Sequence, residues 1–259
     1  MTEKSFPKTK TAIVTGAGAE RGIGRRVAEQ LAIEGWSIAA LDIDENAVRG
    51  FAEDLSRRTE AKVLGFGTDV SCPDSVANTF EAIDRSELPD IYAVVNLAGI
   101  PSPLPFLEID EAHWDKVMSV NAKGTLLVSQ EAAKRMVAKG TPGRFVNTAS
   151  ITAFDGGGTF SKSGYAAAKA AIIGLTKGMA RELGEYAITA NVIAPGPIDT
   201  DIMGGRLTDE RKNQMSSGMA LKRVGQPEEI AALVSFLVSE DSGFITGETI
   251  RIDGGKHIF

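Results

Sequence analysis

The sequence contains few of the residues that build disulfides and metal sites. Among its 259 residues there are one cysteine and two histidines. Cys72 has no second cysteine with which to form an internal disulfide, and His113 and His257 are too isolated to suggest a metal-binding motif. We therefore expect no metal ion, and we expect a reducing compartment, with the cytoplasm as the simplest location.

Long apolar runs and basic stripes are also missing. No stretch reaches the roughly 18 uninterrupted apolar residues of a membrane-spanning helix, and the opening residues MTEKSFPKTK lack the apolar core of a signal peptide. The net charge of -6 is spread along the chain. We therefore expect neither a nucleic acid nor a membrane as a partner. The composition, 43% hydrophobic and 24% charged, is typical of one α/β domain.

The sequence does have a regular alternation of short apolar runs and amphipathic stretches. The predicted strands are 11–16, 37–43, 63–70, 92–99, 144–150, 189–196 and 248–255. The predicted helices include 24–34, 73–85, 111–139, 164–183 and 227–239, and Gly35, Gly140 and Gly184 stand where helices should end. This alternation predicts a doubly wound α/β fold of residues 1–259, in which helices flank both faces of a parallel sheet of about seven strands.

A glycine-rich loop joins the first predicted strand to the first predicted helix. Residues 15–24, TGAGAERGIG, hold four glycines. A helix that starts near Gly22 directs free N–H groups and the positive end of its dipole at whatever lies above it. The glycines allow a pyrophosphate to approach the backbone closely. The pattern favours nucleotide binding, and an ordinary tight turn is the alternative.

An acidic residue follows at the end of the second predicted strand. Asp42 stands 18 residues after Gly24, where a carboxylate can accept hydrogen bonds from an adenosine ribose. A solvated aspartate in the acidic run DIDE is the other reading. A carboxylate would repel the 2′-phosphate of NADP. We therefore expect the Rossmann fold to bind NAD rather than NADP. Arg21 complicates this expectation, because a cation just before Gly22 could lie near that phosphate.

The stretch YAAAK places Tyr165 and Lys169 four residues apart, on one face of a helix. Such a pair occurs by chance on many helices. Ser150 and the stretch NLAG at 96–99 end two other predicted strands, however, and the carboxyl ends of parallel strands form the edge at which open α/β sheets bind ligands. We therefore interpret these three stretches as parts of one site.

Together, these motifs resemble those of the short-chain dehydrogenase/reductases, over nearly the whole chain and with the closing strand of the 3-oxoacyl-reductase branch at 245–255. The resemblance implies a catalytic tetrad of Asn121, Ser150, Tyr165 and Lys169. It implies cofactor contacts by Gly16, Gly18, Arg21, Gly22, Ile23, Gly24, Asp42, Ile43, Asp69, Val70, Asn96, Ala98, Gly99, Tyr165, Lys169, Pro195, Gly196, Ile198 and Thr200. The glycine loop is two residues longer than is usual for the family.

Hydride transfer from an alcohol requires a base within hydrogen-bond reach of its oxygen. Tyr165 is the candidate, and we expect its pKa to be lowered by Lys169 and by the positive nicotinamide. The family implies that Lys169 also binds the nicotinamide ribose, that Ser150 holds the substrate oxygen, and that Asn121 supports a water molecule. Without catalysis, Asn121 would be a buried polar group or a helix kink, and Ser150 a strand end.

The segment 197–222 is long and polar, and it is predicted to be a substrate lid, with a plain surface helix as the alternative. The candidate substrate contacts are Ser150, Thr152, Phe154, Phe160 and Met203. By resemblance, the helices 111–139 and 164–183 also form the subunit contact of a homotetramer.

Three functions are compatible with these motifs. The first is an NAD-dependent oxidoreductase that acts on a small secondary alcohol or ketone, such as a polyol, a sugar derivative or a hydroxy acid. The second is a 3-oxoacyl-carrier-protein reductase that uses NADPH. The third is a protein that senses NAD without catalysis.

Overall fold

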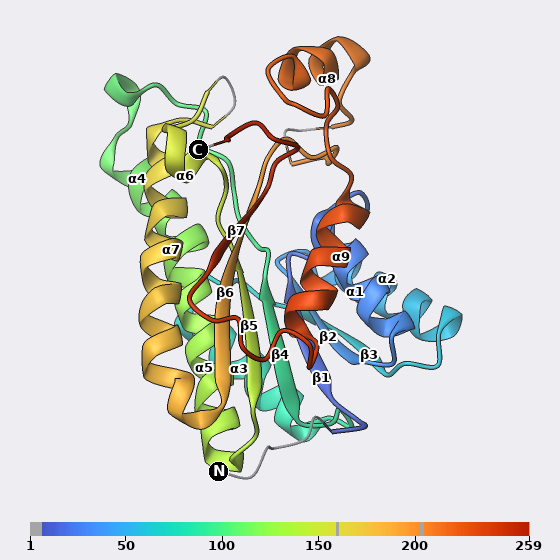
Figure 1. Ribbon diagram of the computed structural model, residues 1–259. Helices are drawn as coiled ribbons and strands as arrows, with labels where there is room; N and C mark the ends of the chain where they lie inside the picture. The colour runs from blue at the N-terminus through green and yellow to red at the C-terminus, as the bar shows by residue number, and fades with distance from the viewer. Residues whose placement is uncertain (1–6, 159–160, 203–204, 259) are drawn as a thin grey trace.

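A single seven-stranded parallel sheet forms the centre of the molecule (Figure 1). The computed structural model describes residues 7–158, 161–202 and 205–258. The strands are β1 (Thr11–Thr15), β2 (Ser37–Asp42), β3 (Val63–Gly67), β4 (Ile91–Asn96), β5 (Gly143–Thr148), β6 (Ile188–Pro195) and β7 (Thr249–Ile252), in the order β3-β2-β1-β4-β5-β6-β7. The predicted doubly wound Rossmann fold is confirmed.

Helices cover both faces of the sheet. On one face lie α1 (Ile23–Ile33), α2 (Glu45–Arg58) and α9 (Pro227–Val238), and on the other lie α3 (Pro73–Arg85), α5 (Gly124–Lys139) and α7 (Ser163–Leu183). The remaining helical segments are η1 (Phe106–Glu108), α4 (Glu111–Met118), η2 (Ser119–Lys123), α6 (Thr152–Asp155), η3 (Gly184–Tyr186) and α8 (Asp209–Ser216). No helix in the described part of the chain is long and apolar enough to cross a membrane.

The two faces of β1 show how the apolar alternation builds the core. Ala12 and Val14 pack in the cluster that includes α1, α2 and α9, whereas Ile13 packs in the cluster that includes α3, α5 and α7. All five residues of β1 are buried, which is typical of a parallel strand that is covered on both sides. Because the strands are parallel, their carboxyl ends meet at one edge, near α6 and α8 (Figure 1).

The predicted helix over 111–139 is interrupted. It consists of α4, the π-helical η2 and α5 in direct succession. Within η2, the Asn121 Nδ2 donates hydrogen bonds to the carbonyl oxygens of Val117 (2.9 Å) and Ile100 (3.1 Å), and the Thr125 Oγ1 donates to the Asn121 carbonyl (2.8 Å). Single π turns inside α-helices are common at functional sites.

Two α-helices of the described structure, α2 and α6, lie outside the stretches predicted to be helical, and α8 lies in the segment 197–222, for which a surface helix is the alternative prediction. The helix α2 follows the acidic run and buries Val48, Phe51, Ala52 and Leu55 at helical spacing. Several predicted strands run past the observed ends, and the predicted strand 63–70, for example, ends at Gly67. Val70 is buried against Gly124 in the loop after β3.

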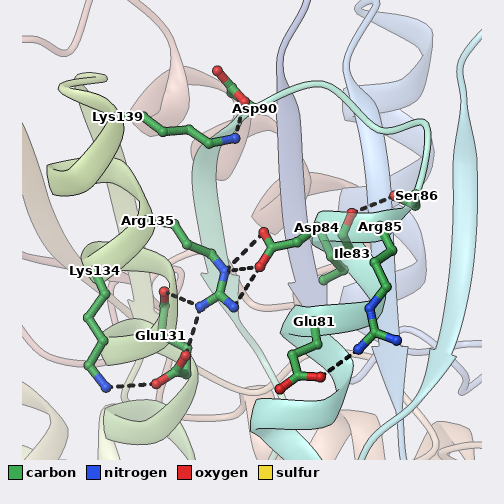
Figure 2. A network of polar contacts seen from close by, with 10 residues as sticks. All are labelled: Glu81, Ile83, Asp84, Arg85, Ser86, Asp90, Glu131, Lys134, Arg135 and Lys139. Carbon is green, nitrogen blue, oxygen red and sulfur yellow. Dashed lines mark hydrogen bonds and ion pairs between the residues drawn. The ribbon is translucent and has the colours of Figure 1, made fainter.

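A cluster of charges joins α3 to α5 on the surface (Figure 2). Arg135 pairs with Asp84 of α3 through two nitrogens and with Glu131 of its own helix at 2.7 Å, and its guanidinium lies over the ring of Phe80. Burial alone would lower the pKa of Arg135, but its hydrogen bonds to Asp84 and Glu131 raise it above the ordinary value. Arg135 is therefore a fixed bridge between two helices.

We predict that Arg135→Met lowers the free energy of unfolding by about 1–2 kcal/mol, because a half-buried bidentate pair and a ring contact are lost. Urea denaturation measures this loss. Arg85→Met is the matched control, because Arg85 forms an exposed pair with Glu81 one turn away, and its cost should stay within about 0.5 kcal/mol. Equal costs for the two variants would contradict the assignment.

Candidate active site

The glycine-rich loop ends in a helix whose first turn lacks a side-chain cap. No side chain hydrogen-bonds the backbone at Gly22, the N-cap of α1, and the first turn contains no acidic residue. By contrast, Asp44, Asp110 and Thr208 cap α2, α4 and α8. The first-turn N–H groups of α1 therefore receive no side-chain acceptor from the N-cap, and they are available to an anion at the carboxyl edge of the sheet.

Close packing explains why this loop is built of glycine. A Cβ on Gly24 would lie 2.3 Å from the Gly16 carbonyl oxygen, so only glycine lets α1 approach the end of β1 this closely. Gly16 itself has a φ of 71°, in the left-handed region, and packs against Ala98. These contacts fit the requirements of a pyrophosphate-binding loop.

Asp42 lies against the same loop. Its Oδ2 accepts a hydrogen bond from the Gly18 N–H (2.8 Å) and its Oδ1 accepts one from the Asp44 N–H (3.0 Å). A Cβ on Gly18 would lie 2.7 Å from the Asp42 Cγ, so Gly18 makes room for the carboxylate. Each carboxylate oxygen has a further lone pair, and Asp42 can therefore still accept a hydrogen bond from a ribose hydroxyl. Its neighbour Ile43 is exposed.

The structure places Arg21 against the segment that follows β6. Its Nη2 donates a hydrogen bond to the Asp199 Oδ1 at 2.8 Å, and its Nε lies 3.1 Å from the Asp201 Oδ1. Arg21 is thus paired with two carboxylates on either side of Thr200.

The loops after β3 and β4 border the glycine loop. Asp69 accepts hydrogen bonds from the N–H and the hydroxyl of Ser71. The N–H groups of Leu97 and Ala98 both donate to the Thr15 Oγ1 at 2.9 Å, which ties the end of β4 to β1.

Asn96 has a structural role in addition to the predicted cofactor contact. Its Nδ2 donates to the Ser129 Oγ (2.9 Å) and to the Asn147 Oδ1 (2.8 Å), and the Asn147 Nδ2 donates to the Thr176 Oγ1 (2.9 Å). All four side chains are buried. This chain of hydrogen bonds joins β4 and β5 to α5 and α7, the helices that flank the site.

Three of the four predicted catalytic residues, Asn121, Tyr165 and Lys169, lie close together at the carboxyl edge. On α7, the Lys169 Nζ lies 5.4 Å from the centre of the Tyr165 ring and donates a hydrogen bond to the Thr148 carbonyl at 2.7 Å. A Cβ on Gly99 would lie 2.6 Å from the Asn121 Oδ1 and 3.6 Å from the Lys169 Nζ. Gly99 is therefore the small residue that lets Asn121 and Lys169 converge.

Ser150 lies two residues beyond Thr148, at the same end of β5. Its Oγ donates to the Thr152 Oγ1 (3.0 Å) and accepts from the Thr152 N–H (3.2 Å).

The Asn121 Oδ1 is buried and has no hydrogen-bond partner in the described structure. A buried acceptor without a partner costs free energy unless water or a ligand satisfies it, so this atom marks a place where a polar molecule fits.

Burial shifts both ionisable groups on α7 toward their neutral forms. It raises the pKa of Tyr165 to about 12 and lowers the pKa of Lys169 to about 8. The expected lowering of the pKa of Tyr165 includes the charge of the nicotinamide, and for the complex with NAD it stays a prediction. Desolvation is the cause in both cases, and the Lys169 Nζ donates its hydrogen bond to the Thr148 carbonyl.

The loop after Ser150 meets the C-terminal residues. The His257 Nε2 lies 2.9 Å from the Asp155 Oδ2, and the Arg251 guanidinium lies 5.9 Å from the centre of the Phe154 ring. Phe154 is partly exposed. The sequence carries no signal for these long-range pairs, and sequence analysis missed them. The other two candidate substrate contacts, Phe160 and Met203, lie outside the described residues.

The segment after β6 is fixed by backbone contacts. The Gly196 N–H donates to the Ile252 carbonyl (3.0 Å), and a Cβ on Gly196 would lie 2.8 Å from the Asp253 Cα. Ile198 pairs with Gly225, and Thr200 is buried. The residues 195–200 therefore lie at the same carboxyl edge as the glycine loop and Ser150.

Comparison with known proteins identifies the family of this chain. The family model described as enoyl-(acyl carrier protein) reductase matches residues 16–257. The chain is 37% identical over 254 residues to the (3R)-3-hydroxyacyl-CoA dehydrogenase of Rattus norvegicus, with 96% of each chain covered. It is 36% identical over 246 residues to the 3-oxoacyl-(acyl-carrier-protein) reductase of Aquifex aeolicus (strain VF5), with 95% of this chain and 96% of the relative covered.

A solved structure shows the same likeness. The crystal structure of a short-chain type dehydrogenase/reductase from Mycobacterium marinum superposes with a TM-score of 0.89 at 32% identity, and the match covers 96% of both chains. Similarity of sequence and of fold thus extends over nearly the whole chain. The chain belongs to the short-chain dehydrogenase/reductase family of oxidoreductases.

Proposed function

We propose that the protein is an NAD-dependent oxidoreductase that interconverts a small secondary alcohol and its ketone. The observation that carries the proposal is the pair Tyr165 and Lys169 on one face of α7, with Lys169 held by the Thr148 carbonyl and Asn121 close by. Bound at the carboxyl edge, NAD would accept the hydride from the alcohol carbon. The polyols, sugar derivatives and hydroxy acids are the substrate classes we propose.

The protein's own groups supply the proton chemistry. Tyr165 removes the hydroxyl proton of the alcohol, and in the reverse direction its phenol donates a proton to the carbonyl oxygen. Lys169 has a pKa of about 8 and can exist in both protonation states near neutral pH. Ser150 orients the substrate oxygen, and Asn121 holds a water molecule beside Lys169 through its unpartnered Oδ1.

The cofactor preference rests on Asp42 and Arg21. The Asp42 carboxylate lies against the glycine loop, where it accepts hydrogen bonds from an adenosine ribose and repels a 2′-phosphate. Arg21 pairs with Asp199 and Asp201, and these two carboxylates compensate its positive charge. Of the remaining predicted contacts, the first turn of α1 takes the pyrophosphate, and the 195–200 segment lies beside the nicotinamide.

A second candidate is a reductase of 3-oxoacyl thioesters that uses NADPH. The names of two relatives, a (3R)-3-hydroxyacyl-CoA dehydrogenase and a 3-oxoacyl-(acyl-carrier-protein) reductase, favour it. Assays with 3-oxoacyl thioesters of CoA and of carrier protein, each with NADH and NADPH, separate it from the first candidate. Turnover of any alcohol or ketone excludes an NAD sensor without catalysis.

We further propose a homotetramer and a substrate lid. Trp114 of α4 and Leu126 of α5 are partly exposed apolar side chains on the helical run predicted to form the subunit contact. The proposed lid, 197–222, contains the helix α8 near the carboxyl edge of the sheet (Figure 1).

Replacing the phenol tests the catalytic assignment. Tyr165→Phe should lower turnover at least about 1,000-fold in a spectrophotometric screen of secondary alcohols, polyols and hydroxy acids, because general acid–base catalysis is lost. The dissociation constant of NAD+ should stay within about threefold, because the ring remains. Tyr186→Phe, at a partly exposed tyrosine of η3, is the control. Activity near wild type in the Tyr165 variant would refute the proposal.

Replacing the carboxylate tests the cofactor assignment. Wild type should prefer NAD+, and Asp42→Ala should reduce the ratio of kcat/KM for NAD+ over NADP+ by about 10- to 100-fold, since hydrogen bonds to a charged group contribute about 1.5–3 kcal/mol. Asp44→Ala is the control, because Asp44 caps α2 and should leave the ratio unchanged. A wild-type preference for NADP+ would contradict the assignment.

A further inference from the structure

The carboxylate of Asp199 receives two cations from distant parts of the chain. The Arg21 Nη2 of the glycine loop lies 2.8 Å from its Oδ1, and the Lys212 Nζ of α8 lies 2.6 Å from its Oδ2. The Asp199 side chain is 7% exposed. Burial would raise the pKa of Asp199, but the hydrogen bond from Lys212 and the charges of Lys212 and Arg21 lower it below the ordinary value. Asp199 is therefore ionised, and each of its two carboxylate oxygens is paired with a cation.

The extended glycine loop delivers Arg21 to this carboxylate. A turn in which the Gly22 N–H donates to the Ala19 carbonyl (2.9 Å) precedes α1, and Arg21 lies within it. The Arg21 Nε also lies 3.1 Å from the Asp201 Oδ1, so one guanidinium contacts the residues on both sides of Thr200. The backbone N–H of Asp199 donates to the Gly225 carbonyl (2.9 Å), and this hydrogen bond also holds the backbone of the segment in place.

We propose that Arg21, Asp199 and Lys212 form a positioning triad that holds the glycine loop, the Thr200 segment and α8 together before the cofactor binds. This inference rests on the proposed function, because the first two elements are the proposed walls of the NAD site. Binding to a site whose walls are already ordered avoids the entropic cost of ordering them. Arg21 is then a positioning residue that acts through Asp199.

A direct contact between Arg21 and a cofactor phosphate is the competing explanation. The two explanations differ in their dependence on Asp199. If Arg21 acts through Asp199, its replacement has a much smaller effect once Asp199 is neutral, because only the pair with Asp201 is then left to lose. If Arg21 binds a phosphate, its replacement has the same effect in both backgrounds, because contributions of independent contacts are additive.

A double-mutant cycle read out by isothermal titration calorimetry with NAD+ alone separates these explanations. Arg21→Met should raise the dissociation constant about tenfold in the wild-type background and at most about threefold in the Asp199→Asn background, where the pair with Asp201 remains. Arg21→Lys should recover part of the affinity. An equal loss in both backgrounds would overturn the triad and favour the phosphate contact.

Two further variants keep the test decisive if Asp199→Asn fails to fold. Lys212→Met, on α8, should raise the dissociation constant about three- to tenfold. An unchanged constant would contradict the triad. Arg58→Met is the matched control, because Arg58 also pairs with two carboxylates, Asp54 and Glu29, but lies in the last turn of α2, outside the proposed cofactor site, and it should change the constant less than about twofold. Absence of NAD+ binding by the wild type would instead overturn the proposed function itself.

Discussion

The hydrogen bond from the Lys169 Nζ to the Thr148 carbonyl is the interaction on which the site depends. It is made in a buried environment, where a lysine without a partner would be costly. It fixes α7 to the end of β5, and therefore fixes Tyr165 relative to Ser150. The absence of a side chain at Gly99 and the π turn around Asn121 complete this arrangement, because they let a second helix reach the same lysine.

Burial keeps the Tyr165 phenol protonated in the free protein. The pKa of Tyr165 is about 12 and that of Lys169 about 8, so neither group is held in its charged form as strongly as it would be in water. An added positive charge nearby would stabilise the phenolate and lower the pKa of Tyr165. In our proposal the oxidised nicotinamide supplies that charge, which would confine strong base character to the complex in which it is needed.

Much of the fold and part of the candidate site could be predicted from local sequence. Short apolar runs between amphipathic stretches predict the parallel sheet, and the spacing of Tyr165 and Lys169 predicts that they share a helix face. Contacts between distant residues could not be predicted in this way. Arg21 and Asp199 are 178 positions apart, and no pattern connects them. The raised pKa of Tyr165 in the free protein could not be predicted either, because desolvation depends on packing that a motif does not encode.

The most direct test of this account is the ionisation of Tyr165 with and without NAD+. The measurement is the phenolate absorbance near 295 nm as a function of pH, taken as the difference between wild type and the Tyr165→Phe variant. Without cofactor, the account predicts a transition near the pKa of about 12, and with saturating NAD+ it predicts a transition about two to three pH units lower. An identical transition in both titrations would contradict the account.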